Sequence, residues 1–483
     1  LSSHASEVWL NPLGGAVVAG PGGSRLYFGE LLQNLDINAR VYKVGTYKSA
    51  VEPYILDGMS AEARENAESL LGALWEEWQA NVKKARPDLD IDRVTKNTVE
   101  WVEASQGDLA KAALEAGLVD KLGTYEEFGE RVAEVAGEDT FNEEPGAFAH
   151  TELGPWLADK PFDSEGDAIG VVTIAGVIVD GMEGPGTAGG ERIAGLLNDA
   201  LDDDLKALVV RVDSPGGSVL GSEEIRLAIL RHKAKGIPIV VSMANVAASG
   251  GYWVSTPADR IFAEPETVTG SIGIFAVIPT FERAAAEWGV NGDGVRTTPL
   301  SGQPDLVDGF TPEVDAILQS SIEDGYADFL SRVSEARNLT TTQVDAIGQG
   351  RVWDGGTARQ IGLVDQYGDI DEALAYAAEK AGLADGEWHA NYLASGPDQY
   401  DTLLRGLLGG ESEAKAPKQG DMFAMVASRQ QGLLRQAHQD LELLLGTKGM
   451  QAYCLECPVS PNAELAAEPR KGWLASMLAS FAR

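Results

Sequence analysis

The sequence contains a long internal repeat. Residues 310–337 align with residues 59–86 at a constant offset of 251, and aromatic positions such as Trp75 and Tyr326 fall together. Two shorter matches flank this block, residues 6–12 with residues 259–265 and residues 117–120 with residues 362–365. Self-similarity over so long a period predicts that the chain is built from two copies of one domain.

The repeat also sets the expected domain boundaries. Residues 1–12 correspond to about residues 254–265, so the stretch from Ile169 to Ser255 has no counterpart in the first copy. We therefore expect a first copy that is truncated at its N-terminus, and a longer native gene product with room there for a signal or anchor. The expected parts are the C-terminal part of the first repeat (1–136), a polar Pro/Gly-rich linker (137–165), the second repeat (166–396) and a helical C-terminal tail (397–483).

Hydrophobic periodicity predicts the element types. In the second copy, expected strands at 169–174, 207–212 and 237–242 alternate with helices at 190–202 and 220–234. This order is typical of an α/β unit with largely parallel strands. In the first copy we expect strands at 7–10, 16–19 and 39–44, and helices at 24–35, 60–85 and 109–116. In the tail we expect helices at 400–408 and 422–445, a charged linker at 411–420 and a short apolar helix at 471–483.

Charge and hydropathy exclude several function classes. Acidic residues number 74 against 38 basic ones, which gives a formal net charge of −36. A surface this negative repels nucleic acid and anionic lipid headgroups, so both are discounted as direct partners. The longest apolar run, Ile169–Val179, is shorter than the ~18 residues that a membrane span needs and suits a buried strand.

The two cysteines stand in one short motif near the C-terminus. Cys454 and Cys457 form a CLEC sequence. Such a pair is compatible with half of a metal site, a redox pair or a disulfide, or has no catalytic task. Because no second Cys or His cluster accompanies it, a zinc site within one chain is not expected.

A small-residue turn follows the third expected strand of the second copy. Residues 247–253 read AASGGYW, which leaves Ser249 with little side-chain bulk around it. An activated hydroxyl needs such an opening, with a backbone N–H beside it that points the same way. The alternative is a turn whose small residues only pack tightly on a neighbour.

Lys48 is the best candidate for a base that would activate this serine. The five histidines lie outside the repeated blocks and the glycine-rich turns, which disfavours a Ser-His-Asp triad. Lys48 lies in the segment VGTYKSAVEP, and the second copy has no lysine at the matching place. A lysine base must be neutral, so its pKa must fall from about 10.4 by about three units, ~4 kcal/mol, through burial. A nearby Glu52 would oppose this unless its carboxylate points away, and a solvated surface lysine remains the alternative.

A glycine-rich loop supplies a candidate for the rest of the site. Residues 213–218 read DSPGGS after an expected strand, and Gly216 and Gly217 can turn a backbone N–H into a cleft. The other interpretation is a phosphate cradle, although the loop lacks the Gly-Lys-Ser/Thr ending of a P-loop.

Four segments together resemble a known family. They are DSPGGS at 213–218, AASGGYW at 247–253, TGSIGIF at 269–275 and VGTYKSAVEP at 44–53. In a tandem-repeat chain these motifs closely resemble the long form of signal peptide peptidase A (protease IV), a family of Ser/Lys-dyad serine peptidases. The similarity runs from about Ala5 to Cys457.

The resemblance implies a fold, a reaction and a location. The fold would be a tandem pair of crotonase-like (Clp-protease-like) α/β domains. The enzyme would be a homotetramer, anchored in the bacterial cytoplasmic membrane by an N-terminal segment absent from this chain. Its catalytic part would lie on the periplasmic side and degrade cleaved signal peptides, with neither cofactor nor metal.

The resemblance also implies residue roles. Ser249 would be the nucleophile and Lys48 the general base, with Ser271 bonded to the lysine. The N–H of Gly250, together with that of Gly216 or Gly217, would form the oxyanion hole. One departure concerns Ala244-Asn245, where the family pattern has two glycines. Two other functions stay open, an acyl-CoA enzyme of the crotonase type and a non-catalytic membrane-associated scaffold.

Overall fold

The computed structural model describes residues 2–159, 165–393, 422–446 and 449–457. The chain divides into two units. The larger unit holds Tyr27–Leu70, Asp163–Ala394 and Glu442–Arg483, and the smaller unit holds Leu1–Leu26, Leu71–Phe162 and Ser395–Leu441. The elements predicted at 400–408, 411–420 and 471–483 lie outside the described residues.

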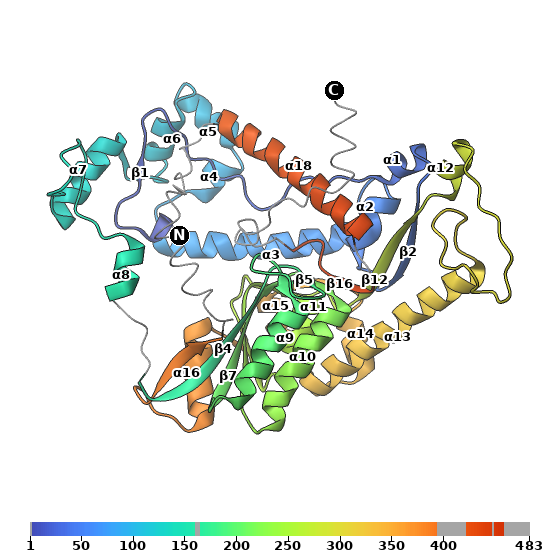
Figure 1. Ribbon diagram of the computed structural model, residues 1–483. Coiled ribbons are helices and arrows are strands. Elements are labelled where there is room, and N and C mark those ends of the chain that lie inside the picture. Colours follow the sequence, from blue (N-terminus) through green and yellow to red (C-terminus); the bar gives the residue numbers. More distant parts are fainter. Residues whose placement is uncertain (1, 160–164, 394–421, 447–448, 458–483) are drawn as a thin grey trace. The chain divides into compact units, whose positions relative to one another are not determined.

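The main sheet of the larger unit is mostly parallel (Figure 1). Its strand order is β13-β11-β9-β7-β4-β15, with β10 beside β9 and β14 beside β10. The strands are β4 (Asp167–Ala175), β7 (Ala207–Ser214), β9 (Ile239–Ala248), β10 (Arg260–Ala263), β11 (Val268–Gly270), β13 (Val352–Asp354), β14 (Gln366–Tyr367) and β15 (Trp388–Tyr392). Only the pairing of β13 with β11 is antiparallel within this sheet. This agrees with the predicted α/β class.

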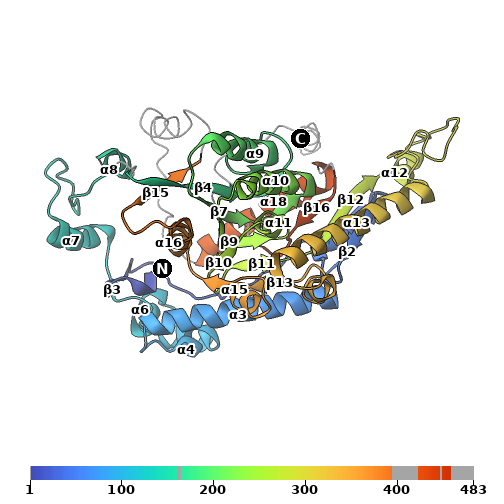
Figure 2. The same cartoon turned by 90° about the horizontal axis from the view of Figure 1, so that it is seen from below.

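Helices cover both faces of this sheet, as Figure 2 shows. Alternate residues of a strand point to opposite faces. Val172 and Val210 accordingly pack with the helices α9 (Gly190–Asp199) and α10 (Val219–Ala234), whereas Val171 and Val209 pack with α16 (Ile370–Ala381). The sheet is therefore buried on both sides, which explains its continuous apolar strands.

A second sheet of the larger unit gathers strands from distant parts of the chain. Its order is β2-β12-β16-β8-β5-β6. The strands are β2 (Asn38–Val44), β12 (Ile274–Thr280), β16 (Gln451–Tyr453), β8 (Gly216–Ser218), β5 (Ile178–Val179) and β6 (Ala188–Gly189). The remaining helices of this unit are α1 (Gly29–Asn34), α2 (Glu52–Ile55), α11 (Gly250–Ser255), α12 (Glu282–Glu287), α13 (Pro312–Arg337), α14 (Thr341–Ile347) and α15 (Gly355–Gln360).

The smaller unit is mainly helical. It contains α4 (Ile91–Thr95), α5 (Thr98–Ala104), α6 (Leu109–Glu115), α7 (Tyr125–Ala136) and α8 (Leu153–Asp159), together with the paired strands β1 (Trp9–Leu10) and β3 (Lys121–Leu122). The fully buried Trp101 packs with Val94 and Ala112 and donates its indole N–H to the Ala112 carbonyl at 3.1 Å. The long helices α3 (Ala61–Ala85) and α18 (Met422–Gly446) each contribute residues to both units.

The internal repeat reappears as equivalent contacts in the two units. Each unit has a bidentate arginine–aspartate pair, Arg86 with Asp120 at 2.7 Å and Arg337 with Asp365 at 2.6 Å. In each pair the aspartate also accepts a backbone N–H, from Val8 just before β1 at 2.7 Å and from Ile261 of β10 at 2.8 Å. The parallel pairs β1–β3 and β10–β14 occupy matching places as well. The exact limits of the two repeats stay a prediction.

Most predicted elements form, with four differences. No strand forms at residues 16–19, and the helix expected from residue 24 begins at Gly29. The predicted linker contains α8, and the tail predicted as helical contains the strand β16. The CLEC pair forms a disulfide, Cys454–Cys457, which was one of the open interpretations.

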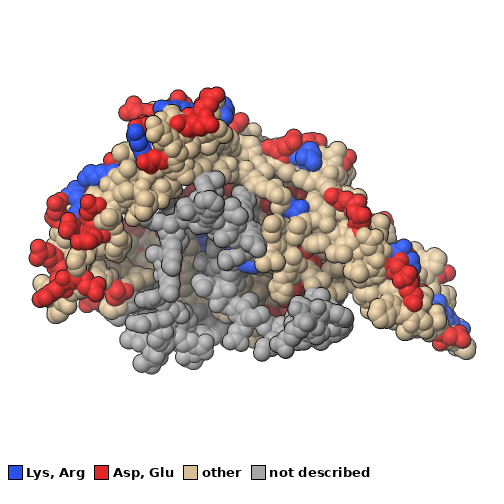
Figure 3. Space-filling view, turned by 90° about the horizontal axis from the view of Figure 1, so that it is seen from above, with Lys and Arg blue, Asp and Glu red and all other residues tan. Residues whose placement is uncertain are grey.

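The surface reflects the acidic composition. On the face in Figure 3, Asp and Glu side chains are more abundant than Lys and Arg. Within the described ranges, no helix combines the length and the apolar character needed to cross a bilayer.

Candidate active site

Ser249 lies at the sharp turn between a strand and a helix, as predicted. β9 ends at Ala248 and α11 begins at Gly250. The backbone of Ser249 has φ +56° and ψ −113°, a conformation that non-glycine residues rarely adopt. Such strain persists where the surroundings impose it, and it is concentrated at functional sites. Here the Ser249 N–H donates to the Gly270 carbonyl at 2.8 Å, which fixes the turn.

The two glycines after Ser249 are required by close packing. A β-carbon at position 250 would lie 2.6 Å from Ser222 Oγ, and one at position 251 would lie 2.6 Å from the Ser214 carbonyl oxygen. The turn therefore packs directly against the end of β7 and the first turn of α10. This packing explains the small-residue run that the sequence shows around Ser249.

An antiparallel strand pair brings Lys48 to this turn from 201 positions upstream. β2 pairs with β12 over seven residues, from Asn38 opposite Thr280 to Val44 opposite Ile274. Lys48 follows β2, and the turn that contains Ser271 precedes β12. The register of this pair therefore decides where the lysine lies.

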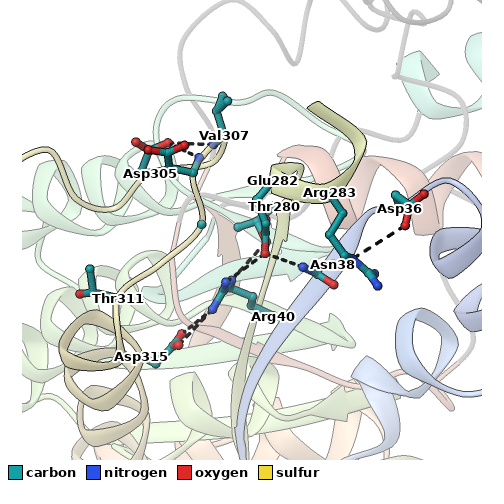
Figure 4. Close-up of polar contacts among 12 residues, drawn as sticks. Asp36, Asn38, Arg40, Thr280, Glu282, Arg283, Asp305, Val307, Thr311 and Asp315 are labelled. Carbon is teal, nitrogen blue, oxygen red and sulfur yellow. Dashed lines mark hydrogen bonds and ion pairs between the residues drawn. The ribbon is translucent and has the colours of Figure 1, made fainter. Parts of the chain in front are cut away.

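Polar contacts hold β2 against its neighbours (Figure 4). Arg40 on β2 forms ion pairs with Asp315 on α13 at 3.0 Å and with Glu282 on α12 at 3.1 Å. Arg40 Nε also donates to Thr280 Oγ1 at 3.1 Å, and Asn38 donates to Glu282. These contacts fix the far end of the strand pair that carries Lys48.

Lys48, Ser249 and Ser271 form one buried cluster. Lys48 Nζ lies 2.9 Å from Ser249 Oγ and donates to Ser271 Oγ at 3.0 Å and to the Ser271 carbonyl at 3.1 Å. Lys48 and Ser271 are each 1% exposed and Ser249 is 0% exposed. All three come from one chain and from the larger unit.

The surroundings favour a neutral lysine. Burial lowers the pKa of Lys48 from its usual 10.5 to about 7, while the negative charge of Glu456 acts in the opposite direction. Glu52, which the sequence left as a concern, accepts from the backbone N–H and the hydroxyl of Ser60 at 3.1 and 2.6 Å. The Glu52 carboxylate is therefore engaged with Ser60, whose hydroxyl accepts the Ala63 N–H at the start of α3. With a pKa of about 7, a large fraction of Lys48 is neutral near pH 7.

The glycine-rich loop also reaches the cluster. A β-carbon at Gly216 would lie 2.5 Å from the Gly250 nitrogen, so the loop and the serine turn are in direct contact. The Gly216 N–H donates to Ser214 Oγ at 3.1 Å. The Gly216 N–H is thus engaged within its own loop, and Gly217 lies opposite Ala452 of β16, so which of the two joins Gly250 in an oxyanion hole stays a prediction.

Sequence reasoning missed a second loop that positions the lysine. The Tyr47 N–H donates to the Gln349 carbonyl at 2.8 Å, and a β-carbon at Gly350 would lie 2.7 Å from the Lys48 nitrogen. Gln349 and Gly350 both have positive φ angles, +54° and +78°. The Gly-Gln-Gly run at 348–350 was the only sequence signal, and its role depends on contacts with a distant segment.

Across the part of the chain that the structure describes, no three carboxylate, imidazole or thiol groups gather as a metal ion would require. The buried amine, the two hydroxyls and the backbone N–H groups are suited to acyl transfer through a serine.

Comparison with known proteins identifies the family. The family model for Peptidase family S49 matches residues 1–138 and 231–384. This chain belongs to Peptidase family S49. The match of the S49 model to two separate stretches, together with the mixed α/β sheets, confirms the predicted tandem α/β fold class.

Curated relatives named Protease 4 confirm the predicted relationship to protease IV. Protease 4 of Salmonella typhi is 40% identical over 412 residues, which cover 85% of this chain and 66% of that protein. Protease 4 of Haemophilus influenzae is 39% identical over 390 residues, which cover 78% and 62%. The putative signal peptide peptidase SppA of Enterococcus faecium is 33% identical over 184 residues, covering 38% and 54%. The chain thus spans less than two thirds of the length of these relatives.

Proposed function

We propose that this chain is a serine endopeptidase in which Ser249 is the nucleophile and Lys48 the general base. The observation that carries the proposal is the distance of 2.9 Å between Lys48 Nζ and Ser249 Oγ, in a site where burial lowers the pKa of Lys48 to about 7. A base must be within hydrogen-bond reach of the proton that it removes and must be unprotonated near the working pH.

The reaction would proceed through an acyl-enzyme. Ser249 Oγ attacks the peptide carbonyl carbon while its proton moves to Lys48 Nζ, and the N–H groups of Gly250 and Gly217 stabilise the oxyanion. The C–N bond then breaks, and Lys48 returns the proton to the leaving amine. Water gives a proton to Lys48 and attacks the ester, the bond to Ser249 Oγ breaks, and the serine regains its proton. Ser271 holds the amine in place throughout.

The substrates and location follow from the S49 relationship. We place cleaved signal peptides and other extended apolar peptides in the site, because the relatives include a putative signal peptide peptidase. The disulfide Cys454–Cys457 supports a site outside the cytoplasm, since disulfides persist in oxidising compartments. From the S49 relationship we also propose that the catalytic part lies on the periplasmic side of the bacterial cytoplasmic membrane, with an N-terminal anchor, and that the enzyme is a homotetramer.

A fluorophosphonate probe that reacts with activated serines tests the proposal. Labelling of one serine that disappears in both Ser249→Ala and Lys48→Ala, while persisting in Ser255→Ala, supports the dyad. Ser255 is a matched control, because it is also buried and lies on α11 six residues further on. Labelling that survives Ser249→Ala refutes the nucleophile assignment, and tight coenzyme A binding without labelling would favour the acyl-CoA enzyme.

A further inference from the structure

The strand β16 occupies the place between β8 and β12 in the second sheet. Gln451 lies opposite Phe275 of β12 on one side and opposite Ser218 of β8 on the other, in antiparallel register with both. The ends are fixed by two backbone hydrogen bonds, from the Val219 N–H to the Met450 carbonyl at 3.1 Å and from the Cys454 N–H to the Pro215 carbonyl at 2.8 Å. The space between β8 and β12 is therefore filled by the chain's own C-terminal segment.

This strand presents a carbonyl group to the proposed oxyanion hole. Ala452 lies opposite Gly217 in the register. A β-carbon at Gly216 would lie 2.1 Å from the Ala452 carbonyl oxygen and 2.5 Å from the Gly250 nitrogen. The Ala452 carbonyl oxygen and the Gly250 N–H therefore lie on the same side of Gly216. Ala452 is fully buried, and its small side chain packs in the main core. The segment is thus seated as an extended peptide would be at a serine peptidase site.

Side chains beyond the strand anchor the segment beside the lysine. Leu455 is 7% exposed and packs in an apolar cluster with Ala50 and Val51, which follow Lys48 by two and three residues. The Cys454–Cys457 disulfide closes a short loop around Leu455, and Glu456 accepts a hydrogen bond from the Ser49 hydroxyl. Sequence reasoning had assigned no role to this motif.

We propose that residues 450–457 are a built-in inhibitor strand that blocks the substrate cleft between β8 and β12, a proposal that rests on the peptidase function above. Extended peptides bind by adding a strand to a sheet, and this place holds only one strand. Because the inhibitor strand is tethered, its effective concentration at the cleft is high and a free peptide competes poorly. The complete burial of Ser249 and Lys48 agrees with a covered site.

The charge of Glu456 adds a second inhibitory effect. It raises the pKa of Lys48 against the effect of burial, so it favours the protonated amine that cannot act as a base. When the inhibitor strand leaves, Glu456 leaves with it. Release of the strand therefore opens the cleft and frees the base in one step.

The test compares two leucine variants of the full chain. Leu455→Asp places a charge in the apolar cluster and should release the strand, whereas Leu445→Asp introduces the same charge at a position that is 41% exposed, ten residues earlier. Fluorophosphonate labelling of Ser249 should be at least about tenfold faster in Leu455→Asp than in the wild type, and unchanged in Leu445→Asp. Equal rates in all three chains would overturn the proposal. Leu455→Ala is the milder variant if Leu455→Asp does not fold.

A synthetic peptide tests the inhibitor in trans. The disulfide-closed peptide of residues 449–457, GMQAYCLEC, should slow the labelling of Leu455→Asp and be recovered with an unchanged mass. A linear peptide with both cysteines replaced by serine is the matched control and should inhibit less. No inhibition, or cleavage of the closed peptide, would overturn an inhibitory role.

Hydrogen exchange separates this proposal from the peptidase function. The amides of Val219 and Cys454 should be protected in the wild type and in Leu445→Asp, and should exchange freely in Leu455→Asp. Fast exchange in the wild type would refute occupation of the cleft whatever the catalytic result. Protection that is lost as expected, with no labelling of any variant, would instead refute the peptidase assignment.

Discussion

The buried lysine should make the protein less stable than a variant without it. Replacing Lys48 by methionine keeps most of the side-chain volume and removes the charge. Burial lowers the pKa of Lys48 from 10.5 to about 7, so the folded state disfavours the protonated amine by an amount on the order of 5 kcal/mol. Methionine gives up three hydrogen bonds, to Ser249 Oγ, Ser271 Oγ and the Ser271 carbonyl, worth about 0.5–1.5 kcal/mol each. We therefore expect a net gain of about 0.5–3 kcal/mol in the free energy of unfolding at pH 6.

The gain must depend on pH in a defined way. Below pH 7 the lysine is protonated in both the folded and the unfolded chain, so the variant has its full advantage. Between about pH 7 and 10.5 the folded wild type has released the proton that the unfolded chain still binds, so the wild type gains stability as the pH rises. Above this window the advantage from the charge is gone.

Urea unfolding followed by tryptophan fluorescence measures this difference. Trp253 is 1% exposed and reports on the core that contains the site. Lys84→Met, at an exposed position of α3, is the matched control and should show no such change between pH 6 and 10. A Lys48→Met variant that is less stable than the wild type at pH 6 would refute the claim that burial disfavours the protonated form of Lys48. A difference in the free energy of unfolding that does not change with pH would refute it as well.

Three further predictions concern the same site. The peptidase activity should fall about tenfold for each pH unit below pH 7 as Lys48 becomes protonated. Glu456→Gln removes a charge that raises the pKa of Lys48, so it should move this acid fall of the pH–activity profile to lower pH. A profile that is unchanged in Glu456→Gln would contradict the effect of Glu456. Gly350→Ala should slow peptide cleavage on the order of 100-fold, because the added β-carbon displaces Lys48. Gly236→Ala is the control and should not slow cleavage, because Gly236 has a similar φ of +82° but no atom near its β-position. Equal effects of the two substitutions would contradict the role of Gly350 in positioning Lys48. Arg40→Met should lower the free energy of unfolding by about 1–3 kcal/mol and should slow the labelling of Ser249. Arg283→Met is the control and should do neither, because the Arg283 side chain is half exposed. An Arg40→Met variant with unchanged stability and labelling would show that the β2–β12 pair does not depend on the contacts of Arg40.

Local signals explain why so much of the site could be predicted. Ser249 needs small neighbours because the turn packs on Ser214 and Ser222. The residues that meet this requirement are consecutive in the sequence, so a local pattern reveals them. Helices such as α3 and strands such as β7 follow the period of their apolar residues. The repeat placed Lys48 and Ser249 in complementary copies, and the structure brings them to hydrogen-bond distance.

The parts that escaped prediction depend on distant contacts. Residues 16–19 are apolar enough for a strand, but a strand forms only where a neighbour supplies backbone hydrogen bonds. β16 has three residues, too few for a periodic pattern, and forms because β8 and β12 lie on both sides of it. The Gln349–Gly350 loop matters only because it contacts Lys48 from 300 positions away, which no local pattern records.

The rate of Ser249 labelling as a function of pH tests the dyad most directly. In Leu455→Asp, where the cleft should be open, the rate should rise through a single ionisation with a pKa near or below 7. Adding Lys48→Met should slow labelling by about 100-fold or more and remove this ionisation. A double variant that labels at the rate of Leu455→Asp, or that keeps the same pH dependence, would show that Lys48 is not the base.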